Sequence, residues 1–310
     1  MSTAPGTPLL GPIAALYAPA SRPDRFVKAL TSGADAIVVD LEDAVPARGK
    51  DAARDAVISL LTSLAHQGPQ PQQAPQVAVH VRINGFGSPW WERDAAALAE
   101  LADRDPAARP AAVRLPKVED PGQVRSVAAL LGGQIALHCL IESARGLEAA
   151  LDIARAHPCV AGIGLGEADL AGDLGVAAET GLDWARSRIV VAARAAGLPS
   201  PAMSVYTRLD DAEGLYASCV AGRRAGFLGR AVLHPRQIPV VFRAFTPDRA
   251  EVAAAEATLD ALGRADLLAG GTAVLPDGSF ADRAMAEAAH RVLALSRLAA
   301  ERSAGAGRTA

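Results

Sequence analysis

The feature that most constrains this fold is a repeated alternation of short apolar runs with longer segments of helical periodicity. Runs such as Ile135–Ile141 and Val160–Leu165 are short and show no polar alternation, which is typical of strands buried on both faces of a parallel sheet. The segment between these two, Ala144–Ala156, predicts an amphipathic helix, so the unit is β-α-β. Eight runs of this kind are found: Pro12–Tyr17, Ala36–Val39, Val77–Ile83, Ala112–Leu115, Ile135–Ile141, Val160–Leu165, Ala202–Tyr206 and Gly226–Leu233.

Eight β-α units over roughly 240 residues match the usual size of a (β/α)8 TIM barrel in the α/β class. A doubly wound open sheet is the alternative. It would not need eight strands, and no phosphate-binding glycine pattern follows the first run. We therefore predict an N-terminal tail over residues 1–11, a barrel over 12–241 and a C-terminal helical extension over 242–310. The extension contains helical stretches at Pro247–Gly263 and Ala281–Arg302, and it would pack under the barrel or on a neighbouring subunit.

Composition and charge exclude several classes of protein. No apolar run approaches the ~18 residues that cross a membrane, and the N-terminus lacks the pattern of a signal peptide. A net charge of −3 gives no general basic field for nucleic acid. The three cysteines, Cys139, Cys159 and Cys219, fit no metal or redox spacing. We interpret them as reduced packing residues of a cytoplasmic protein.

Two acids follow adjacent predicted strands. Glu142 comes after the fifth run, and Asp169 follows the sixth. Groups just beyond the carboxyl ends of parallel strands converge on one site. Two carboxylates with open water positions are a usual way to hold Mg²⁺. The pair therefore predicts a magnesium site, against the alternative that both acids are solvated loop residues or helix N-caps.

Arg82 lies in an otherwise apolar predicted strand, so its charge needs a partner. It would bind a substrate carboxylate or a developing enolate oxygen in a forked geometry, or instead form a structural salt bridge to Glu42 or Asp43. Glu42 and Asp43 follow the second strand. We predict that they lie beside the metal and orient Arg82, with a plain polar turn as the alternative.

A cationic patch, Arg22, Arg25 and Lys28, lies at the start of a predicted helix. It would catch the phosphates of a nucleotide-like ligand such as coenzyme A, although ordinary solvated helix charge explains it equally well. His80 and His138 fall within apolar runs and predict core histidines, and His234 predicts a structural hydrogen-bonding group at a strand end.

At DLEDAVP, VRIN, LPKVED, LIESARG, GEADLAGDLG and GFLGRAVLHPRQIPV the sequence resembles the HpcH/HpaI aldolase/citrate lyase superfamily. The branch it resembles most contains the citrate lyase β subunit and the malyl-CoA and citramalyl-CoA lyases. The motifs run in order from Gly11 to Val241. The resemblance implies a TIM barrel, a Mg²⁺ ion, a CoA thioester substrate and a homotrimer or hexamer.

Site residues carried over by position agree with the reading from the residues. Glu142 and Asp169 resemble the Mg²⁺ ligands, with Glu142 also near the substrate. Arg82 resembles the arginine that binds the 2-oxo acid, which would be oxaloacetate, pyruvate or glyoxylate. Glu42 and Asp43 resemble the acids beside the metal's water positions, and the segment of Arg22, Arg25 and Lys28 resembles part of the CoA-binding surface.

The resemblance predicts a reversible carbon–carbon lyase that cleaves a 3-hydroxy-3-carboxyacyl-CoA, such as citryl-CoA, malyl-CoA or citramalyl-CoA, to a 2-oxo acid and an acyl-CoA. One departure stands out, because Met203 lies about where relatives carry an aspartate. A milder one is Arg230 in place of a lysine. The alternatives are a metal-dependent aldolase on free hydroxy-oxo acids and a non-catalytic barrel that binds CoA or an oxo acid, which Met203 would favour.

Overall fold

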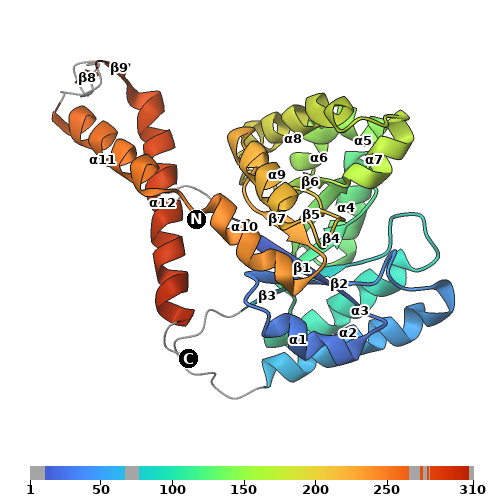
Figure 1. Cartoon of the computed structure of the whole chain (residues 1–310). Helices are drawn as coiled ribbons and strands as arrows, with labels where there is room; N and C mark the ends of the chain where they lie inside the picture. Colours follow the sequence, from blue (N-terminus) through green and yellow to red (C-terminus); the bar gives the residue numbers. More distant parts are fainter. Residues whose placement is uncertain (1–10, 67–76, 265–272, 275–277, 279, 307–310) are drawn as a thin grey trace. The chain divides into compact units, whose positions relative to one another are not determined.

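The computed structural model describes residues 11–66, 77–264, 273–274, 278 and 280–306. The chain divides into two compact units, with the boundary between Val241 and Phe242. The first unit is built on one parallel sheet of seven strands, in the order β6-β5-β4-β3-β2-β1-β7 (Figure 1). The strands are β1 (Ala14–Pro19), β2 (Ala36–Asp40), β3 (Ala78–Arg82), β4 (Ala112–Leu115), β5 (Ala136–Ile141), β6 (Val160–Leu165) and β7 (Arg230–Val232).

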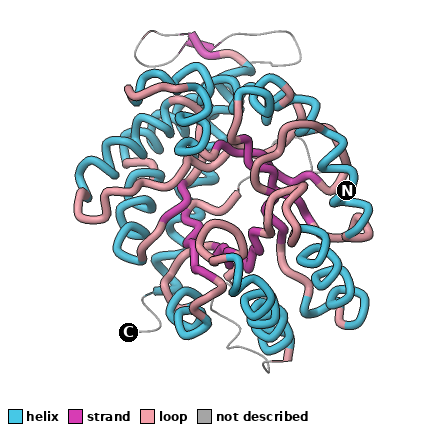
Figure 2. The backbone as a smooth tube through the Cα atoms, turned by 90° about the vertical axis from the view of Figure 1, so that its right-hand side faces the viewer, coloured by secondary structure: helices cyan, strands magenta, loops and turns pink. Residues whose placement is uncertain are grey.

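Helices alternate with these strands and form the outer layer. Figure 2 shows the strands of the first unit curling around its middle, with the helices outside them. The α-helices are α1 (Phe26–Leu30), α2 (Lys50–Ala65), α3 (Trp91–Arg104), α4 (Pro121–Leu130), α5 (Ala144–Glu148), α6 (Ala150–Ala154), α7 (Glu167–Leu174), α8 (Asp183–Ala195) and α9 (Ala212–Arg224). Short 3-10 helices are η1 (Pro23–Arg25), η2 (Ala47–Gly49), η3 (Pro106–Ala108), η4 (Glu179–Leu182) and η5 (Pro235–Gln237). The α/β barrel class is confirmed.

The predicted strand Ala202–Tyr206 is the main difference from the expected pattern, and the prediction of a regular strand there was wrong. Only Met203 forms a bridge, to Arg230, with its N–H donating to the Gly229 carbonyl at 2.9 Å. On the other side, the Ser204 hydroxyl donates to the Leu165 carbonyl at 2.6 Å. A side-chain hydrogen bond thus takes the place of backbone hydrogen bonds between this segment and β6.

Two further differences concern helices. The predicted helix Ala144–Ala156 is two short helices, α5 and α6, which meet at Ala149. Helix α7 was not predicted, because its eight residues follow β6 directly and look like a polar loop. It places Asp169 in its first turn.

The second unit follows helix α10 (Ile238–Phe245), which spans the boundary. It contains α11 (Arg249–Arg264), α12 (Arg283–Ala306) and an antiparallel pair, β8 (Ala273–Val274) and β9 (Phe280–Ala281). Ala261, Leu262 and Ala281 form its small buried cluster. Both predicted helical stretches are present, although the second begins at Arg283, because Ala281 belongs to β9. Packing of this unit on a neighbouring subunit stays a prediction. Among the described helices, none is long and apolar enough to cross a membrane.

Candidate active site

A cavity of about 310 Å³ lies inside the first unit and reaches the carboxyl ends of its strands. Its lining includes Glu142, Asp169, Arg82 and Asp43, which come from four different strand ends or the turns after them. Four of the residues predicted from sequence therefore line one cavity. The convergence follows from the parallel sheet, since every strand ends at the same edge.

Glu142 directly follows β5 and is buried, with 5% of its surface exposed. Its Oε2 atom has no hydrogen-bond partner among the described residues. Burial, together with the charges of Glu42 and Asp169, raises the pKa of Glu142 to about 7. Gly166 lies beside Glu142. A Cβ at position 166 would lie 2.7 Å from the Glu142 carboxyl carbon, so only glycine fits without displacing this side chain. An unpartnered carboxylate oxygen next to two other acids is suited to receive a cation.

Asp169 is exposed and faces the same cavity from the first turn of α7. No group of three His, Cys, Asp or Glu side chains that could hold a metal occurs in the described part of the chain. Glu142 and Asp169 would thus supply two ligands, and the remaining positions would fall to water and substrate oxygens. That is the usual arrangement for Mg²⁺, so the residues present fit the ion.

Arg82 points its guanidinium fork at Asp40, its neighbour across the β2–β3 register. Nε donates to Oδ1 and Nη2 to Oδ2 of Asp40, both at 2.7 Å. The third nitrogen, Nη1, forms ion pairs with Glu42 at 2.8 Å and Asp43 at 3.3 Å. Glu42 and Asp43 were predicted as partners of Arg82, whereas Asp40, whose forked contact fixes the orientation of the guanidinium, was not.

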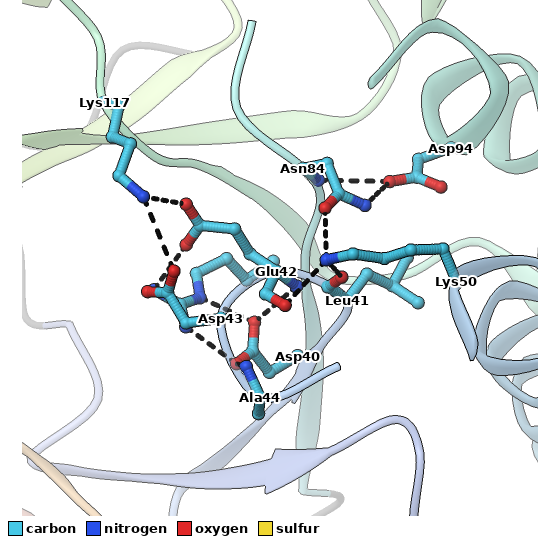
Figure 3. A network of polar contacts seen from close by, with 10 residues as sticks. Asp40, Leu41, Glu42, Asp43, Ala44, Lys50, Asn84, Asp94 and Lys117 are labelled. Atoms are coloured by element: carbon cyan, nitrogen blue, oxygen red, sulfur yellow. Dashed lines mark hydrogen bonds and ion pairs between the residues drawn. The ribbon is translucent and has the colours of Figure 1, made fainter. Parts of the chain in front are cut away.

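Lys117 closes the acidic turn from the β4 side, as Figure 3 shows. Its ammonium contacts Glu42 at 2.6 Å and Asp43 at 3.5 Å. Burial raises the pKa of Glu42, in spite of Arg82 and Lys117. Burial also opposes ionisation of Asp43, but Arg82 and Lys117 outweigh it and lower the pKa of Asp43. Both acids form ion pairs with the guanidinium, so the salt bridge given as the alternative for Arg82 is present, and Asp43 is the more readily ionised of the two.

A buried lysine supports the same turn and was not predicted. Lys50, in the first turn of α2, donates to the carbonyls of Leu41 and Glu42 at 2.7 and 2.8 Å and to the Asn84 amide oxygen at 2.6 Å (Figure 3). Asn84 in turn donates to Asp94 at 2.6 Å. Lys50 thus holds the backbone that carries the site acids, although in sequence it resembles an ordinary charge at a helix start.

The expected CoA patch lies apart from the cavity lining. Arg22, Arg25 and Lys28 are exposed, and Arg22 pairs with Asp24 at 2.8 Å. Arg25 ends η1, and Lys28 lies in the last turn of the five-residue helix α1 that follows it.

His80 is buried, as predicted for a core histidine, whereas His138 is only partly buried and lines the cavity. Burial, with the nearby charge of Arg114, lowers the pKa of His80 to about 2 and that of His138 to about 3. His234 caps η5 by accepting a hydrogen bond from the Arg236 N–H at 3.1 Å.

Met203 and Arg230, the two departures noted in the sequence, contact each other. Met203 is buried and lines the cavity. The Nη2 atom of Arg230 lies 3.3 Å from the Met203 sulfur and 2.9 Å from the Ser218 hydroxyl. Burial lowers the pKa of Arg230. This wall of the cavity therefore offers an apolar thioether where an acid was expected.

The chain is similar in sequence and in structure to several known proteins. The family model described as HpcH/HpaI aldolase/citrate lyase matches residues 14–235. A "(3S)-malyl-CoA thioesterase" of Cereibacter sphaeroides is 33% identical over 286 residues, which cover 90% of this chain and 92% of the relative. An "L-malyl-CoA/beta-methylmalyl-CoA lyase" of Rhodobacter capsulatus is 31% identical, covering 84% of this chain and 86% of the relative. The crystal structure of CitE from Mycobacterium tuberculosis, in complex with magnesium, acetoacetate and coenzyme A, superimposes with a TM-score of 0.73 at 30% identity and covers 93% of this chain and 98% of that one.

Proposed function

The chain belongs to the HpcH/HpaI aldolase/citrate lyase family, and from that premise we propose that it is a Mg²⁺-dependent carbon–carbon lyase acting on CoA thioesters. It cleaves a 3-hydroxy-3-carboxyacyl-CoA, such as citryl-CoA, malyl-CoA or citramalyl-CoA, to a 2-oxo acid and an acyl-CoA, and it works in both directions. The observation that carries the proposal is the buried Glu142, whose unpartnered oxygen shares a cavity with Asp169 and Arg82.

Glu142 and Asp169 are the residues that would hold the magnesium ion. When bound there, Mg²⁺ acidifies the substrate hydroxyl and stabilises negative charge on its oxygens. Ionised Glu142 is costly without a cation, because its site is buried and already acidic. The protein therefore holds a carboxylate ready for a divalent ion rather than for an internal salt bridge.

The bond that breaks joins the thioester α-carbon to the hydroxyl-bearing carbon. The hydroxyl loses its proton to a base, its carbon becomes the carbonyl of the 2-oxo acid, and the bonding pair passes to the thioester as an enolate. A proton then returns to the α-carbon. Glu42 and Asp43 are the candidate proton carriers, and Asp43 has the lower pKa of the two.

Arg82 supplies fixed positive charge beside these acids. Its fork is held by Asp40, so it cannot swing toward solvent, and Nη1 faces Glu42 and Asp43. A guanidinium held in this way stabilises a substrate carboxylate or the developing oxyanion without having to reorganise.

The proposal extends to the CoA part of the substrate, the cellular compartment and the oligomeric state. Arg22, Arg25 and Lys28 would contact the phosphates of CoA, and their exposure supports this. Three free cysteines, Cys139, Cys159 and Cys219, support a cytoplasmic enzyme. By likeness to its family we expect a homotrimer or hexamer.

The test is turnover of (S)-malyl-CoA, citramalyl-CoA and citryl-CoA by the purified full chain with Mg²⁺. We expect one of these thioesters to release a 2-oxo acid, and chelation with EDTA to stop the release. Asp169→Asn should abolish it, whereas Asp152→Asn, an exposed carboxylate on α6, serves as the matched control and should not. Release of an oxo acid that is unaffected by EDTA would overturn the metal assignment.

A second candidate is hydrolysis of the same thioesters, because a relative at 33% identity is named a thioesterase. The two reactions differ in their products. A lyase yields a 2-oxo acid and keeps the thioester bond, whereas a thioesterase yields a hydroxy acid and a free CoA thiol. Detecting thiol and oxo acid in one reaction separates them. Thiol without oxo acid would replace the lyase proposal with hydrolysis.

A further inference from the structure

A second guanidinium, Arg114 on β4, lies within the cavity and has no acidic partner. It is 7% exposed, and its only hydrogen bond within the described residues runs from Nε to the His80 Nδ1 atom at 3.4 Å. Its Cζ lies 5.9 Å from the centre of the Tyr17 ring. Neither terminal nitrogen, Nη1 or Nη2, has an acceptor in that part of the chain. An arginine remains charged under all ordinary conditions, so these donors require an anion or water.

The strand register places Arg114 beside the proposed catalytic residues. Arg114 pairs with Arg82 on one side and with His138 on the other, and these three side chains form a row across β3, β4 and β5. All three line the cavity. The next position in the row is Gly162, where a Cβ would lie 2.7 Å from the His138 Nδ1 atom. The His138 ring therefore occupies the space that a side chain at Gly162 would fill.

The interior is open on this side and not packed. Along β5, Ala136, His138 and Leu140 alternate with fully buried neighbours, yet each keeps some accessible surface. His138 and Leu140 also line the cavity, so the accessible surface of these two side chains faces it. A barrel interior is ordinarily filled by apolar layers. Here a charged donor borders unfilled space instead.

Charge compensation differs sharply between the two arginines. Arg82 contacts three carboxylates, those of Asp40, Glu42 and Asp43. Arg114 contacts His80, a neutral acceptor, and lies near His138, which is also neutral because burial lowers the pKa of both rings. A buried guanidinium whose direct contacts are all neutral is costly unless a ligand supplies negative charge.

We propose that Arg114 binds a second carboxylate of the substrate, carried on the side chain of the 2-oxo acid, and so selects dicarboxylic over monocarboxylic 2-oxo acids. This rests on the proposed function, because Glu142, Asp169 and Arg82 hold the oxo-acid end. Adjacent strands lie about 4.8 Å apart. Carboxyl carbons separated by three or four single bonds of about 1.5 Å lie roughly 4–5 Å apart. The spacing of a four- or five-carbon dicarboxylate therefore matches that of the two neighbouring strands.

Calorimetry on the full chain with Mg²⁺ tests the proposal, with oxaloacetate, 2-oxoglutarate and pyruvate as probes. The wild type should bind at least one dicarboxylate ten- to a hundredfold more tightly than pyruvate, as expected for a hydrogen-bonded charge pair. Arg114→Met should reduce this preference to less than threefold and leave pyruvate affinity unchanged. Arg125→Met, an exposed arginine on α4, is the matched control and should keep the preference.

The outcomes separate this subsite from the function it rests on. Mg²⁺-dependent binding of all three acids with equal affinity would overturn the Arg114 subsite and leave the lyase proposal standing. A preference for dicarboxylates that survives in Arg114→Met would also overturn the Arg114 subsite and leave the lyase proposal standing. Failure of every probe to bind with Mg²⁺ would overturn both. Absence of a dicarboxylate preference in the wild type would overturn the subsite even if Arg114→Met did not fold, and removal of an uncompensated buried charge should not lower the melting temperature of the variant.

Discussion

Replacing Glu142 with glutamine should stabilise the metal-free protein at alkaline pH and abolish its stabilisation by Mg²⁺. Burial and the nearby acids raise the pKa of Glu142 to about 7, from an ordinary value of 4.5. The folded state therefore holds this proton more tightly than the unfolded state. Stability is fully present below pH 4.5 and is lost progressively as the pH rises through about 7. The ionised carboxylate thus destabilises the folded, metal-free protein.

The magnitude follows from the same two values. A difference of about 2.5 units at 1.36 kcal/mol each gives an upper limit of about 3 kcal/mol above pH 8. A buried glutamine amide also lacks partners, so we expect a net gain of about 2 kcal/mol for Glu142→Gln. For a domain of this size that corresponds to roughly 4–8 °C in melting temperature. At pH 5 the difference should be small, because folded wild type is then protonated at Glu142.

Scanning calorimetry in EDTA at pH 5 and pH 8.5, repeated with Mg²⁺ at pH 8.5, measures these effects. Wild type should gain stability with Mg²⁺, and the variant should not, since only a binding species shifts the folding equilibrium. Equal melting temperatures for both proteins at pH 8.5 in EDTA would refute the burial argument. Equal stabilisation of both by Mg²⁺ would show that Glu142 is not a ligand.

Three further changes test the parts that position the site. Lys50→Met removes the donor for two backbone carbonyls and one amide oxygen. It should lower the free energy of unfolding, measured by urea denaturation, by about 2–4 kcal/mol and raise the KM for the thioester. Unchanged stability would contradict the supporting role of Lys50. Ser204→Ala removes the hydroxyl that joins the segment of the Met203 bridge to β6. It should lower the free energy of unfolding by about 1–2 kcal/mol, which denaturant midpoints would detect. Unchanged stability would mean that the backbone closes the barrel without this hydroxyl. Gly166→Ala would displace Glu142 and should weaken Mg²⁺ binding at least tenfold by calorimetry. Gly172→Ala, in helix α7 with open space around it, is the control, and equal affinity of the two variants for Mg²⁺ would count against the argument.

The strand ends were predictable because they depend on local pattern. The runs Ala112–Leu115 and Val160–Leu165 were predicted with the same bounds as β4 and β6. The parallel order then brings Glu142 and Asp169 to one cavity, since sequence alone tells which residues follow each strand. The segment at Met203 failed because its neighbours bond to it through side chains, and apolar periodicity does not show whether a ladder forms.

The partners of charged residues were harder to predict, because they depend on register and packing between distant segments. Asp40 lies across from Arg82 only once β2 and β3 are aligned, although the pairing of these two neighbouring parallel strands was a usable signal for this contact. Lys50 gives no signal of its burial, because a lysine at a helix start is ordinarily solvated. Arg114 was overlooked within an apolar run, although its charge there was as conspicuous as that of Arg82.

A crystal structure with Mn²⁺ in place of Mg²⁺ and a bound 2-oxo acid would test the central claim most directly, because anomalous scattering locates the metal without assumption. We predict one metal peak within about 2.0–2.3 Å of a carboxylate oxygen of Glu142 and of one from Asp169, with the oxo acid completing the coordination. A peak on Asp40, Glu42 or Asp43 instead, or an ordered oxo acid with no metal beside Glu142, would contradict the account.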